Sequence, residues 1–507
     1  MKIRLSLVIY FFLFPALLLA QVDFKKLDAY LAKSQKEWGV PGMSIGVVKD
    51  GKLVFAKGYG TAEMGTNKKV DENTLYAIAS NSKAFTATAI ALLVQEGKLK
   101  WNDPVQKYLP YFQLKDPTTS SMVTIKDLLC HRVGLGTFSG DIIWHRADRT
   151  AEDIIKHIQY LEPEFGFRDG FGYSNLMYIT AGEVIRVVSG QDWGTFVTNR
   201  LLKPLDMNRS VYQLEVLRTL SNVATPHELT SEGVNRPIDW VDWETVGATG
   251  GLISSVKDMS QWAIFNLNHG IWGKDTLLTR ASRNTLWTPY NTFGVDHVNP
   301  KAFRNFSGYA LGWQMSDYYG HLRVSHTGGY DGMISAFALY PDDNMAVIVL
   351  TNGLKAPIGS IPNYIADRFF GLPEKDWSAD DLKNREANQK RDTRIADRKK
   401  ARVMGTTPAL KPEQIAGKYK SDIYGNIEIK VVNNDLRISF EHTPDYTSTL
   451  KHWHYDTYEI IWDKPQAWFQ HGTVKVNYDN NMKIIGLDFD VPNDDIFFEE
   501  LKPKRLP

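Results

Sequence analysis

A serine and a lysine stand three residues apart in the stretch YAIASNSKAFTATAIALLVQEG, which begins at Tyr76 and otherwise has the composition of a buried helix. On a helix, Ser80 and Lys83 would share a face. Burial disfavours the charge of a lysine, and the dipole at a helix N-terminus opposes it as well. An amine that loses its proton easily is, however, the base that a serine hydroxyl needs in order to attack a carbonyl. The pair therefore predicts a nucleophile, Ser80, activated by Lys83.

The same four-residue pattern occurs twice more, so it is a weak signal by itself. SSVK at Ser254 opens an amphipathic segment in which Ser255 and Asp258 have the spacing of a capping box, and this favours a helix start. STLK at Ser448 lies in a β-rich segment, where residues three apart do not face each other. For Ser80 the alternative role is a structural N-cap.

Two later groups add polar side chains of other kinds. The triplet Tyr173-Ser174-Asn175 precedes a helical segment, and His326-Thr327-Gly328-Gly329 ends a β-rich run. Taken singly, a core tyrosine, an N-cap asparagine and a turn histidine would explain them. It is their order along the chain, after Ser80 and Lys83, that makes the set specific.

The elements that would position these residues follow from hydrophobic periodicity. Alternating runs that begin at Met43 and Met333, with turns at Asp50-Gly51 and at residues 341–344, predict two β-hairpins. Strands at both ends with helices between them predict an α+β fold, in which both ends of the unit form one antiparallel sheet around an inserted helical lobe. Helical periodicity occurs in residues 85–95, 125–129, 151–160, 177–188, 259–267 and 358–370.

Composition changes twice in the last third of the chain. Residues 379–402 hold Asp, Lys, Arg, Glu and Asn with hardly an apolar side chain, which predicts a solvated helical or flexible linker over residues 376–407. Short alternating runs with Asn and Gly turns then predict a small all-β domain, residues 408–507. The main unit would span residues 21–375.

The first twenty residues have the pattern of a signal peptide. Lys2 and Arg4 precede an apolar run from Leu5 to Leu19, and Ala20 suits cleavage before Gln21. We therefore expect residues 1–20 to be removed from an exported protein, periplasmic or secreted, without a stable membrane anchor. A retained anchor is the alternative.

Composition excludes several classes of function. The chain has 507 residues and a formal net charge of +1, so no overall positive field favours nucleic acid as a partner. The single cysteine, Cys130, excludes a disulfide framework and a thiolate zinc site within one chain. The pattern Gly-x-Ser-x-Gly occurs only as GMSIG at residues 42–46, inside the first β-rich run and not at a strand-to-helix turn, and no His-Glu-x-x-His helix occurs in the sequence. We expect no metal and no cofactor.

The three groups together resemble the motifs of the serine β-lactamase and penicillin-binding-protein superfamily. The tyrosine triplet resembles the class C β-lactamase-like branch, with its esterases and D-aminopeptidase-like hydrolases. The phrases DLLCHRVGLG and TGGLISSVKDMSQWA are similar to that branch as well. The resemblance covers about residues 24–370, and the tail resembles a lipocalin-like domain often appended to such hydrolases.

This resemblance implies a role for each residue. Ser80 would attack a carbonyl, and Lys83 and Tyr173 would share the proton transfer as a pair that titrates as a unit, with the lysine stabilising a phenolate. Asn175 would orient Lys83 and the acyl chain. The backbone N–H groups of Ser80 and Gly329 would form the oxyanion hole. Residues 326–328 (His326, Thr327, Gly328) would contact the substrate.

His326 departs from the penicillin-processing members, which carry a lysine there. A neutral histidine would hold a penicillin carboxylate less firmly. We therefore expect hydrolysis of a small-molecule ester, amide or short peptide through an acyl-enzyme on Ser80. The alternatives are a β-lactamase or D-alanyl carboxypeptidase, and a non-catalytic penicillin-binding-type module. The all-β domain could shape substrate access, bind a ligand or mediate oligomerisation.

Two neighbourhoods have both a functional and a structural interpretation. Trp240 and Trp243 precede the glycine run GATGG, and as a hypothesis they line the acyl pocket, the alternative being a core aromatic pair. Cys130 lies beside His131, but adjacent residues seldom face each other on a helix, so we predict Cys130 to be a core residue.

Overall fold

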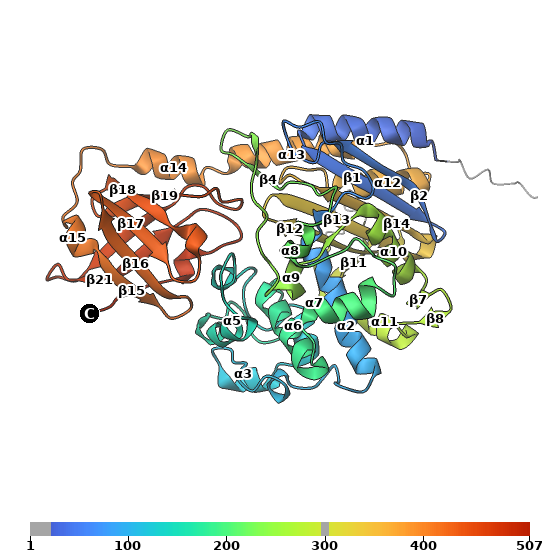
Figure 1. Ribbon diagram of the computed structural model, residues 1–507, viewed down its shortest axis with the longest axis horizontal. Helices are drawn as coiled ribbons and strands as arrows, with labels where there is room; N and C mark the ends of the chain where they lie inside the picture. The colour runs from blue at the N-terminus through green and yellow to red at the C-terminus, as the bar shows by residue number, and fades with distance from the viewer. Residues whose placement is uncertain (1–21, 296–303) are drawn as a thin grey trace, which may run out of the picture.

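The computed structural model describes residues 22–295 and 304–507 as two bodies joined by helices (Figure 1). The larger, N-terminal body is built around an eight-stranded sheet, and the smaller is a closed barrel. The predicted signal peptide, residues 1–20, lies outside the described residues. Within the described ranges, no helix has both the length and the apolar character that a membrane span requires.

The sheet of the N-terminal body joins the two predicted hairpins. Asp50 and Gly51, with φ angles of 51° and 72°, make the turn of the first hairpin, as a two-residue turn with both angles positive requires. The first strand of this hairpin pairs antiparallel with the last strand of the second, Met43 opposite Thr351. The predicted sheet from both ends of the unit is thereby confirmed. In spatial order the strands are β2 (Lys52–Gly60), β1 (Gly42–Lys49), β14 (Met345–Thr351), β13 (Met333–Tyr340), β12 (His321–Tyr330), β11 (Gln314–Tyr318), β10 (Ser307–Tyr309) and β9 (Asn291–Thr292).

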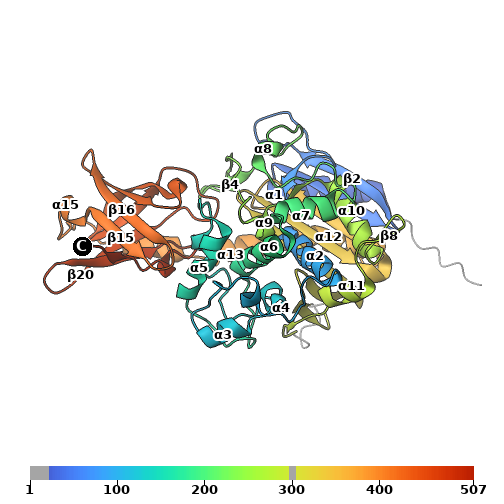
Figure 2. The same ribbon diagram turned by 60° about the horizontal axis from the view of Figure 1, so that its bottom comes forward.

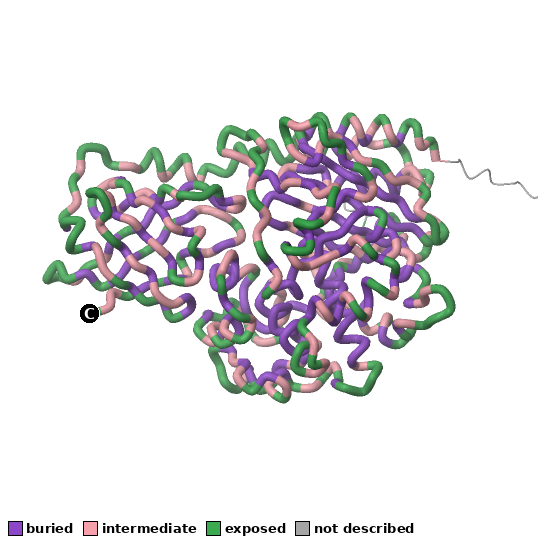
Figure 3. The backbone as a smooth tube through the Cα atoms, in the orientation of Figure 1, coloured by how far each residue is buried: buried purple, intermediate pink, exposed green. Residues whose placement is uncertain are grey.

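Helices cover both faces of this sheet, so its central strands are buried throughout (Figure 3). On β14, Met345, Val347 and Val349 pack with α1 (Phe24–Trp38) and α12 (Ser360–Phe369). The alternate residues of β14, such as Ile348, pack in the cluster that contains α2 (Ser82–Gln95) and α10 (Val256–Leu267). Burial on two faces explains why this strand has a continuous apolar run in the sequence.

The helical lobe is inserted between β2 and β9. The helices predicted at residues 85–95, 125–129, 177–188 and 259–267 are confirmed to within a few residues, while the one predicted over 151–160 is α-helical only to His157 and ends in a 3₁₀ turn, Ile158–Tyr160. Figure 2 shows α5 on the side of the lobe that faces the barrel. The helices of the lobe are α3 (Pro117–Met122), α4 (Ile125–Leu129), α5 (Ala151–His157), α6 (Asn175–Ser189), α7 (Trp193–Val197), α8 (Leu214–Leu217), α9 (Gly247–Gly250) and α11 (Arg280–Leu286). The same part of the chain forms three short two-stranded sheets: β3 (Tyr76–Ala77) with β6 (Ile253–Ser254), β4 (His227–Leu229) with β5 (Asn235–Pro237), and β7 (Ile271–Trp272) with β8 (Asp275–Thr276).

The charged run after the sheet forms two mostly exposed helices, α13 (Trp377–Arg391) and α14 (Arg394–Ala401). The start of α13 is attached to the N-terminal body, because the indole of Trp38 donates a 3.0 Å hydrogen bond to Ser378 Oγ. The second helix lies along the barrel, where Arg398 pairs with Asp490 at 2.5 Å. The run therefore connects the two bodies through polar contacts with each.

The all-β domain is a closed antiparallel barrel, which leaves no free sheet edge. Its interior is filled by aromatic rings, among them Phe440, Tyr446, Phe489 and Phe498, whose centroids lie 5.4–6.2 Å apart. After the short helix α15 (Pro412–Ile415) its strands are β15 (Gly417–Ser421), β16 (Gly425–Val432), β17 (Asp435–Phe440), β18 (Ser448–His454), β19 (Thr457–Trp462), β20 (Thr473–Tyr478), β21 (Ile484–Asp490) and β22 (Lys504–Arg505).

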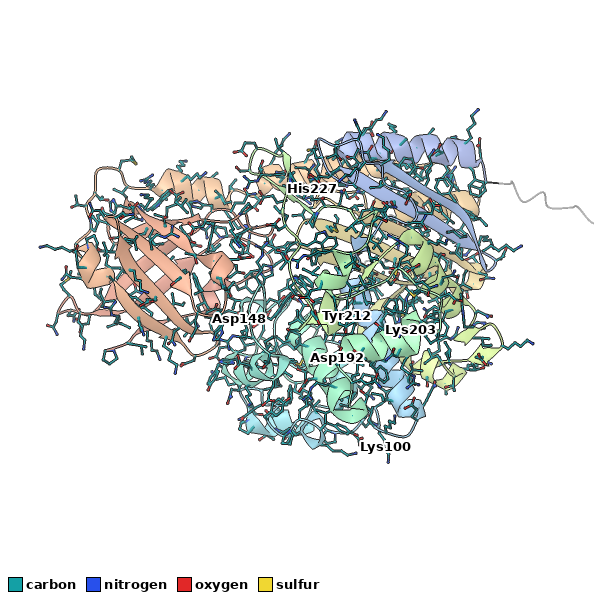
Figure 4. All side chains as sticks on the ribbon, viewed as in Figure 1. Lys100, Asp148, Asp192, Lys203, Tyr212 and His227 are labelled. Atoms are coloured by element: carbon teal, nitrogen blue, oxygen red, sulfur yellow. The ribbon has the colours of Figure 1, made fainter. Side chains whose placement is uncertain are left out.

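The barrel is docked against the lobe by polar contacts, of which the one between His145 and Tyr446 is buried. His145 Nδ1 lies 2.6 Å from the hydroxyl of Tyr446 in the barrel. Asp148, labelled in Figure 4 where the lobe meets the barrel, lies 2.9 Å from His442 Nδ1. The carboxylate of Glu500 accepts hydrogen bonds from Ser139 Oγ at 2.6 Å and from the backbone N–H of Gly140 at 2.8 Å. These contacts hold two barrel loops beside the segment that precedes α5.

Candidate active site

Ser80 lies in a one-turn 3₁₀ helix, Ala79–Asn81, that leads into α2. The preceding residue, Ala79, has a φ of 48°, a backbone conformation that costs a non-glycine residue about 1–3 kcal/mol. Hydrogen bonds from the sheet hold the turn in place: Ser335 Oγ donates to the carbonyl of Ile78 at 2.9 Å, and Asn81 Nδ2 donates to Ser335 Oγ at 2.9 Å. The serine is therefore presented on a strained turn that β13 fixes.

Lys83 is fully buried, and its amine points at Ser80. Its Nζ lies 3.1 Å from Ser80 Oγ, 2.8 Å from Asn175 Oδ1 and 2.7 Å from the carbonyl of Thr249. A neutral amine has two N–H donors and one lone pair. Besides Ser80, three acceptors surround the amine: Asn175 Oδ1, the Thr249 carbonyl and, at 2.9 Å, Thr249 Oγ1. A neutral amine that directs its two N–H groups at two of these acceptors can turn its lone pair toward the hydroxyl hydrogen of Ser80.

Burial lowers the pKa of Lys83 well below its ordinary value, and the charge of Asp141 only partly opposes this. Within the described residues its buried amine has no ion pair, so the neutral form is favoured. The amine also lies over two aromatic faces, 4.8 Å from the ring centroid of Tyr173 and 5.2 Å from that of Tyr178. Burial therefore favours the neutral amine, the form that can act as a base.

Tyr173 and Asn175 flank Ser174, the N-cap of α6, and Asn175 is the first residue of that helix. Burial raises the pKa of Tyr173, although a hydrogen bond with the Ser80 side chain opposes the shift. This differs from the sequence-based expectation that a cationic lysine would stabilise a phenolate. Both members of the pair are driven toward their neutral forms, because burial is the largest influence on the pKa of each.

A buried carboxyl that sequence reasoning missed lies behind Asn175. Asp141 Oδ2 accepts a 2.6 Å hydrogen bond from Asn175 Nδ2, and its Oδ1 accepts one of 2.8 Å from the Trp144 indole. The amide of Asn175 is thereby oriented, with its oxygen toward Lys83 and Thr249 Oγ1, the latter 2.7 Å away. Burial raises the pKa of Asp141 to about 8.

His326 lies on β12 and is buried with both ring nitrogens in use. Its Nδ1 is 2.6 Å from the carbonyl of Thr327, so this nitrogen carries the hydrogen, and Nε2 accepts from the hydroxyl of Tyr309 at 2.9 Å. Burial, with the nearby Lys83, lowers the pKa of His326 to about 3. The imidazole is therefore neutral and bound within the protein, and it offers a substrate carboxylate no charge.

The glycines of β12 let the strand approach the nucleophile turn closely. A Cβ on Gly328 would lie 2.3 Å from the carbonyl oxygen of Ile78, so only glycine fits there. Gly329 follows, and Ser80 stands across the gap on its turn. The two residues predicted to supply the oxyanion hole thus border one cavity.

This cavity has a volume of about 260 Å³. Trp243 is part of its wall, whereas Trp240 lines a neighbouring groove of about 1180 Å³ at the junction with the barrel. Cys130, predicted to be a core residue, is buried and outside this lining. The cavity is lined by Ser80, Phe138, Asp141, Trp144, His145, Tyr173, Asn175, Trp243, Gln314, His326, Thr327, Gly328, Gly329, Trp468, Asp495 and Ile496.

The last three residues of this lining come from the barrel. Trp468 lies in the loop after β19, and Asp495 and Ile496 lie in the segment after β21. A Cβ on Gly329 would lie 3.0 Å from the Trp468 ring, so the indole is seated against this strand. No motif marks these residues, and only the docking of the barrel brings them to the cavity. Thr249 carries a weak signal, since it stands in the glycine run that follows the two tryptophans.

Comparison with known proteins agrees with this architecture. Residues 27–367 match the Beta-lactamase family, and residues 401–505 match a domain of unknown function, DUF3471. The chain is 32% identical over 326 residues to "Unguisins hydrolase ungD'" of Aspergillus campestris, covering 62% of this chain and 59% of that protein. It is 31% identical over 332 residues to "Protein flp" of Staphylococcus aureus, covering 65% of this chain and 63% of that protein. The chain therefore spans about three fifths of each curated relative.

Solved structures share the fold at low sequence identity. An octameric penicillin-binding protein homologue from Pyrococcus abyssi aligns with a TM-score of 0.62 and 23% identity, over 93% of this chain and 98% of that one. A D-stereospecific amidohydrolase from Streptomyces sp. aligns with a TM-score of 0.55 and 22% identity, over 69% of this chain and 100% of that one. With the family match over residues 27–367 and the eight-stranded sheet, this chain belongs to the β-lactamase family of serine hydrolases.

Proposed function

We propose that this protein hydrolyses ester or amide bonds of small molecules through an acyl-enzyme formed on Ser80. The observation that carries the proposal is the Lys83 amine, which is fully buried, lies 3.1 Å from Ser80 Oγ and is held by acceptors on Asn175 and Thr249. Such an amine can accept the serine proton during attack.

The chemistry then proceeds in two halves. Ser80 Oγ attacks the substrate carbonyl while its proton passes to Lys83 Nζ, and the backbone N–H groups of Ser80 and Gly329 stabilise the oxyanion. The proton moves to the leaving alcohol or amine, with the Tyr173 hydroxyl, which contacts Ser80, as the relay. Water repeats the sequence on the acyl-enzyme, so that the carboxylic acid leaves and Ser80 regains its proton.

The lining of the cavity favours esters and amides over penicillins. His326 is neutral and both its nitrogens have partners, so it cannot hold a penicillin carboxylate as a lysine would. The relative whose printed name describes a hydrolase of unguisins supports a hydrolytic role. Intact Ser80, Lys83, Tyr173 and Asn175 in hydrogen-bonding positions speak against a non-catalytic module.

Intact-protein mass spectrometry tests the proposal. Wild type and Ser80→Ala are incubated with a nitrophenyl ester, a penicillin and a D-alanyl peptide, and released product is followed in parallel. We expect a burst of product and one acyl adduct in wild type, neither of them in Ser80→Ala. A folded wild type that forms no adduct and turns over none of the three would refute the proposal.

Export and assembly are further parts of the proposal. The basic and apolar pattern of residues 1–20 supports export to the periplasm or medium, and a mature N-terminus at Gln21 would verify it. Oligomerisation through the barrel stays a prediction, which light scattering of the purified protein would test.

A further inference from the structure

Asp141 is a buried acid that stands directly behind Asn175, at the start of the 3₁₀ turn Asp141–Ile143. Each of its carboxyl oxygens accepts from an N–H group, Oδ2 from Asn175 Nδ2 at 2.6 Å and Oδ1 from the Trp144 indole at 2.8 Å. A protonated carboxyl carries a hydrogen on one oxygen, and that hydrogen would here face a second donor. The contacts therefore fit the ionised carboxylate.

This carboxylate decides which end of the Asn175 amide faces the base. An amide has a donor end and an acceptor end, and Asp141 takes the donor end. The acceptor end, Oδ1, lies 2.8 Å from Lys83 Nζ and 2.7 Å from Thr249 Oγ1. If the amide were reversed, its NH₂ group would face the amine, and Lys83 would lose one of its acceptors. A chain of contacts thus runs from Ser80 through Lys83 and Asn175 to Asp141.

A positive charge forms on Lys83 when it takes the serine proton, and it forms in a fully buried place. In the described part of the chain, Asp141 is the acid whose charge raises the pKa of Lys83 against the effect of burial. The influence is mutual, because burial raises the pKa of Asp141 to about 8 and the charge of Lys83 opposes that rise. A charged lysine and a charged aspartate therefore stabilise each other across the amide between them.

The other titratable side chains that interact with Lys83, among the described residues, are held neutral. Burial raises the pKa of the phenols and lowers that of the imidazoles, and the charge of Lys83 lowers the imidazole pKa values further. From the barrel, Asp495 raises the pKa of Asp141. The neutral groups are Tyr173 and Tyr178, over whose rings the amine lies, and His131 and His326.

We propose that Asp141 is a positioning residue that supplies the counter-charge for the ammonium formed on Lys83 during acylation, acting through the amide of Asn175. When Ser80 attacks, its O–H bond breaks and the proton forms the third N–H bond of Lys83. The proton then passes to the leaving alcohol or amine, and none moves to Asp141. The carboxylate of a serine–histidine–aspartate triad does the same for its histidine, without an amide in between. This inference rests on the proposed function and adds a residue to its machinery.

Two variants separate the charge of Asp141 from its hydrogen bonds. Asp141→Asn removes the charge and leaves one of the two donors, on Asn175 or Trp144, without an acceptor. In the double variant Asp141→Asn with Asn175→Asp, the side chain at position 141 can accept from Trp144 and donate to the carboxylate at position 175, which also faces Lys83. The hydrogen bonds are then kept, and the negative charge lies one residue closer to the base.

The measured quantities are the acylation rate and the pH midpoint at which this rate falls to half in acid. The probe is whichever of the nitrophenyl ester, the penicillin and the D-alanyl peptide acylates wild type. We expect Asp141→Asn to acylate ~10-fold or more slowly at high pH, with a midpoint lower by ~0.5 pH unit or more, because Lys83 loses the charge that favours its proton. The double variant should have a midpoint above that of wild type. Asp169→Asn, at an exposed position of the same lobe, should match wild type in both quantities.

The midpoint distinguishes this role from a structural one. A folded Asp141→Asn protein that is slower but has the wild-type midpoint would overturn the inference, as would a double variant whose midpoint does not rise. Circular dichroism checks folding, and if Asp141→Asn does not fold, the double variant decides, since it keeps the hydrogen bonds. If wild type forms a Ser80-dependent adduct while all midpoints coincide, only this inference fails. A wild type that none of the probes acylates refutes the proposed function, and this inference with it.

Discussion

Burying an amine beside a serine decides which protonation state the lysine can keep. In water Lys83 would be charged, but inside the fold it is surrounded by carbonyl oxygens and two aromatic rings, with Asp141 as the nearest acid. Its pKa is lowered chiefly by burial, which favours the neutral form. The instability that this burial causes is inseparable from its use as a base.

Lys83→Arg separates charge from proton transfer at this position. A guanidinium forms hydrogen bonds but does not lose its proton at accessible pH, so acylation should fall about 10²–10⁴-fold. In wild type the acylation rate should fall as the pH is lowered and the amine becomes protonated, with a midpoint well below the ordinary lysine pKa of about 10.4. Burst kinetics with a nitrophenyl ester measure both effects.

The control for this substitution is Lys257→Arg, in the second Ser-x-x-Lys pattern, where the side chain is exposed at the start of α10. Its kinetics should match those of wild type. Normal acylation by a folded Lys83→Arg protein would show that Lys83 is not the base.

The residues that sequence patterns could predict are those that lie in local motifs. Ser80 and Lys83 are one helical turn apart, and Tyr173 and Asn175 are two apart, so spacing alone indicates that each pair acts together. Asp141 and Asp495 belong to no motif. They are 354 positions apart by number and become neighbours only after the lobe and the barrel have folded and docked.

At the scale of elements, the site depends on how closely β12 approaches the nucleophile turn. Gly328 has no room for a side chain, because the carbonyl of Ile78 and the hydroxyl of Ser335 lie 2.3 and 2.7 Å from the position that a Cβ atom would occupy. The same two groups are hydrogen-bonded to each other. The strand β12, the turn that carries Ser80 and the strand β13 therefore form one rigid support for the oxyanion donors.

Gly328→Ala should push β12 and the turn apart. We expect a loss of about 1–3 kcal/mol in the free energy of unfolding, as for other overpacked sites, and a fall in kcat of ~100-fold as the donors on Ser80 and Gly329 separate. Denaturant unfolding and steady-state kinetics measure the two quantities.

Gly294→Ala is the matched control, since a Cβ there meets no atom within 4 Å. It should leave stability and activity as in wild type. If Gly328→Ala retained full kcat, the close approach of β12 would not be what aligns the oxyanion donors.

Elements with an apolar face or a distinctive turn were predictable, and those held by polar contacts were not. The Asp50-Gly51 turn and the alternation around it indicate the first hairpin directly. The charged helices have almost no buried side chain, and α13 is attached at its start through the Trp38–Ser378 hydrogen bond and the packing of Trp377 and Leu382 on the core. Nothing in the pattern of a charged run identifies such a contact in advance.

At the scale of the whole molecule, one buried carboxylate links the sheet, the lobe and the barrel. Asp331, directly after β12, lies 3.2 Å from His145 Nε2 and 3.0 Å from Arg146 Nη2 in the lobe. His145 in turn contacts Tyr446, and Arg146 pairs with Asp445, both in the barrel. The position of the barrel loops at the cavity is thereby coupled to the strand that carries His326 and Gly329.

Asp331→Asn should weaken this junction in a pH-dependent way. Burial alone would raise the pKa of Asp331, but His145 and Arg146 outweigh it and hold the pKa well below its usual range. A carboxyl with a depressed pKa contributes stability that is present above its unfolded pKa of about 3.9 and is lost as the pH falls through the folded value. At pH near 7 the variant leaves Arg146 buried without its main partner, a loss of about 3–5 kcal/mol.

Thermal unfolding across a pH series, followed by circular dichroism, measures this difference. Tm of Asp331→Asn should lie well below that of wild type from mildly acidic to neutral pH. The gap should begin to narrow below pH ~4, where the unfolded chain takes up the proton that folded Asp331 still refuses, and should close only as the pH falls through the lower folded pKa. Asp342→Asn, an exposed aspartate at the other end of β13, should track wild type throughout. A gap that stayed constant into strong acid would mean that the charge of Asp331 is not what joins the bodies, and packing alone would then have to hold Asp495 at the cavity.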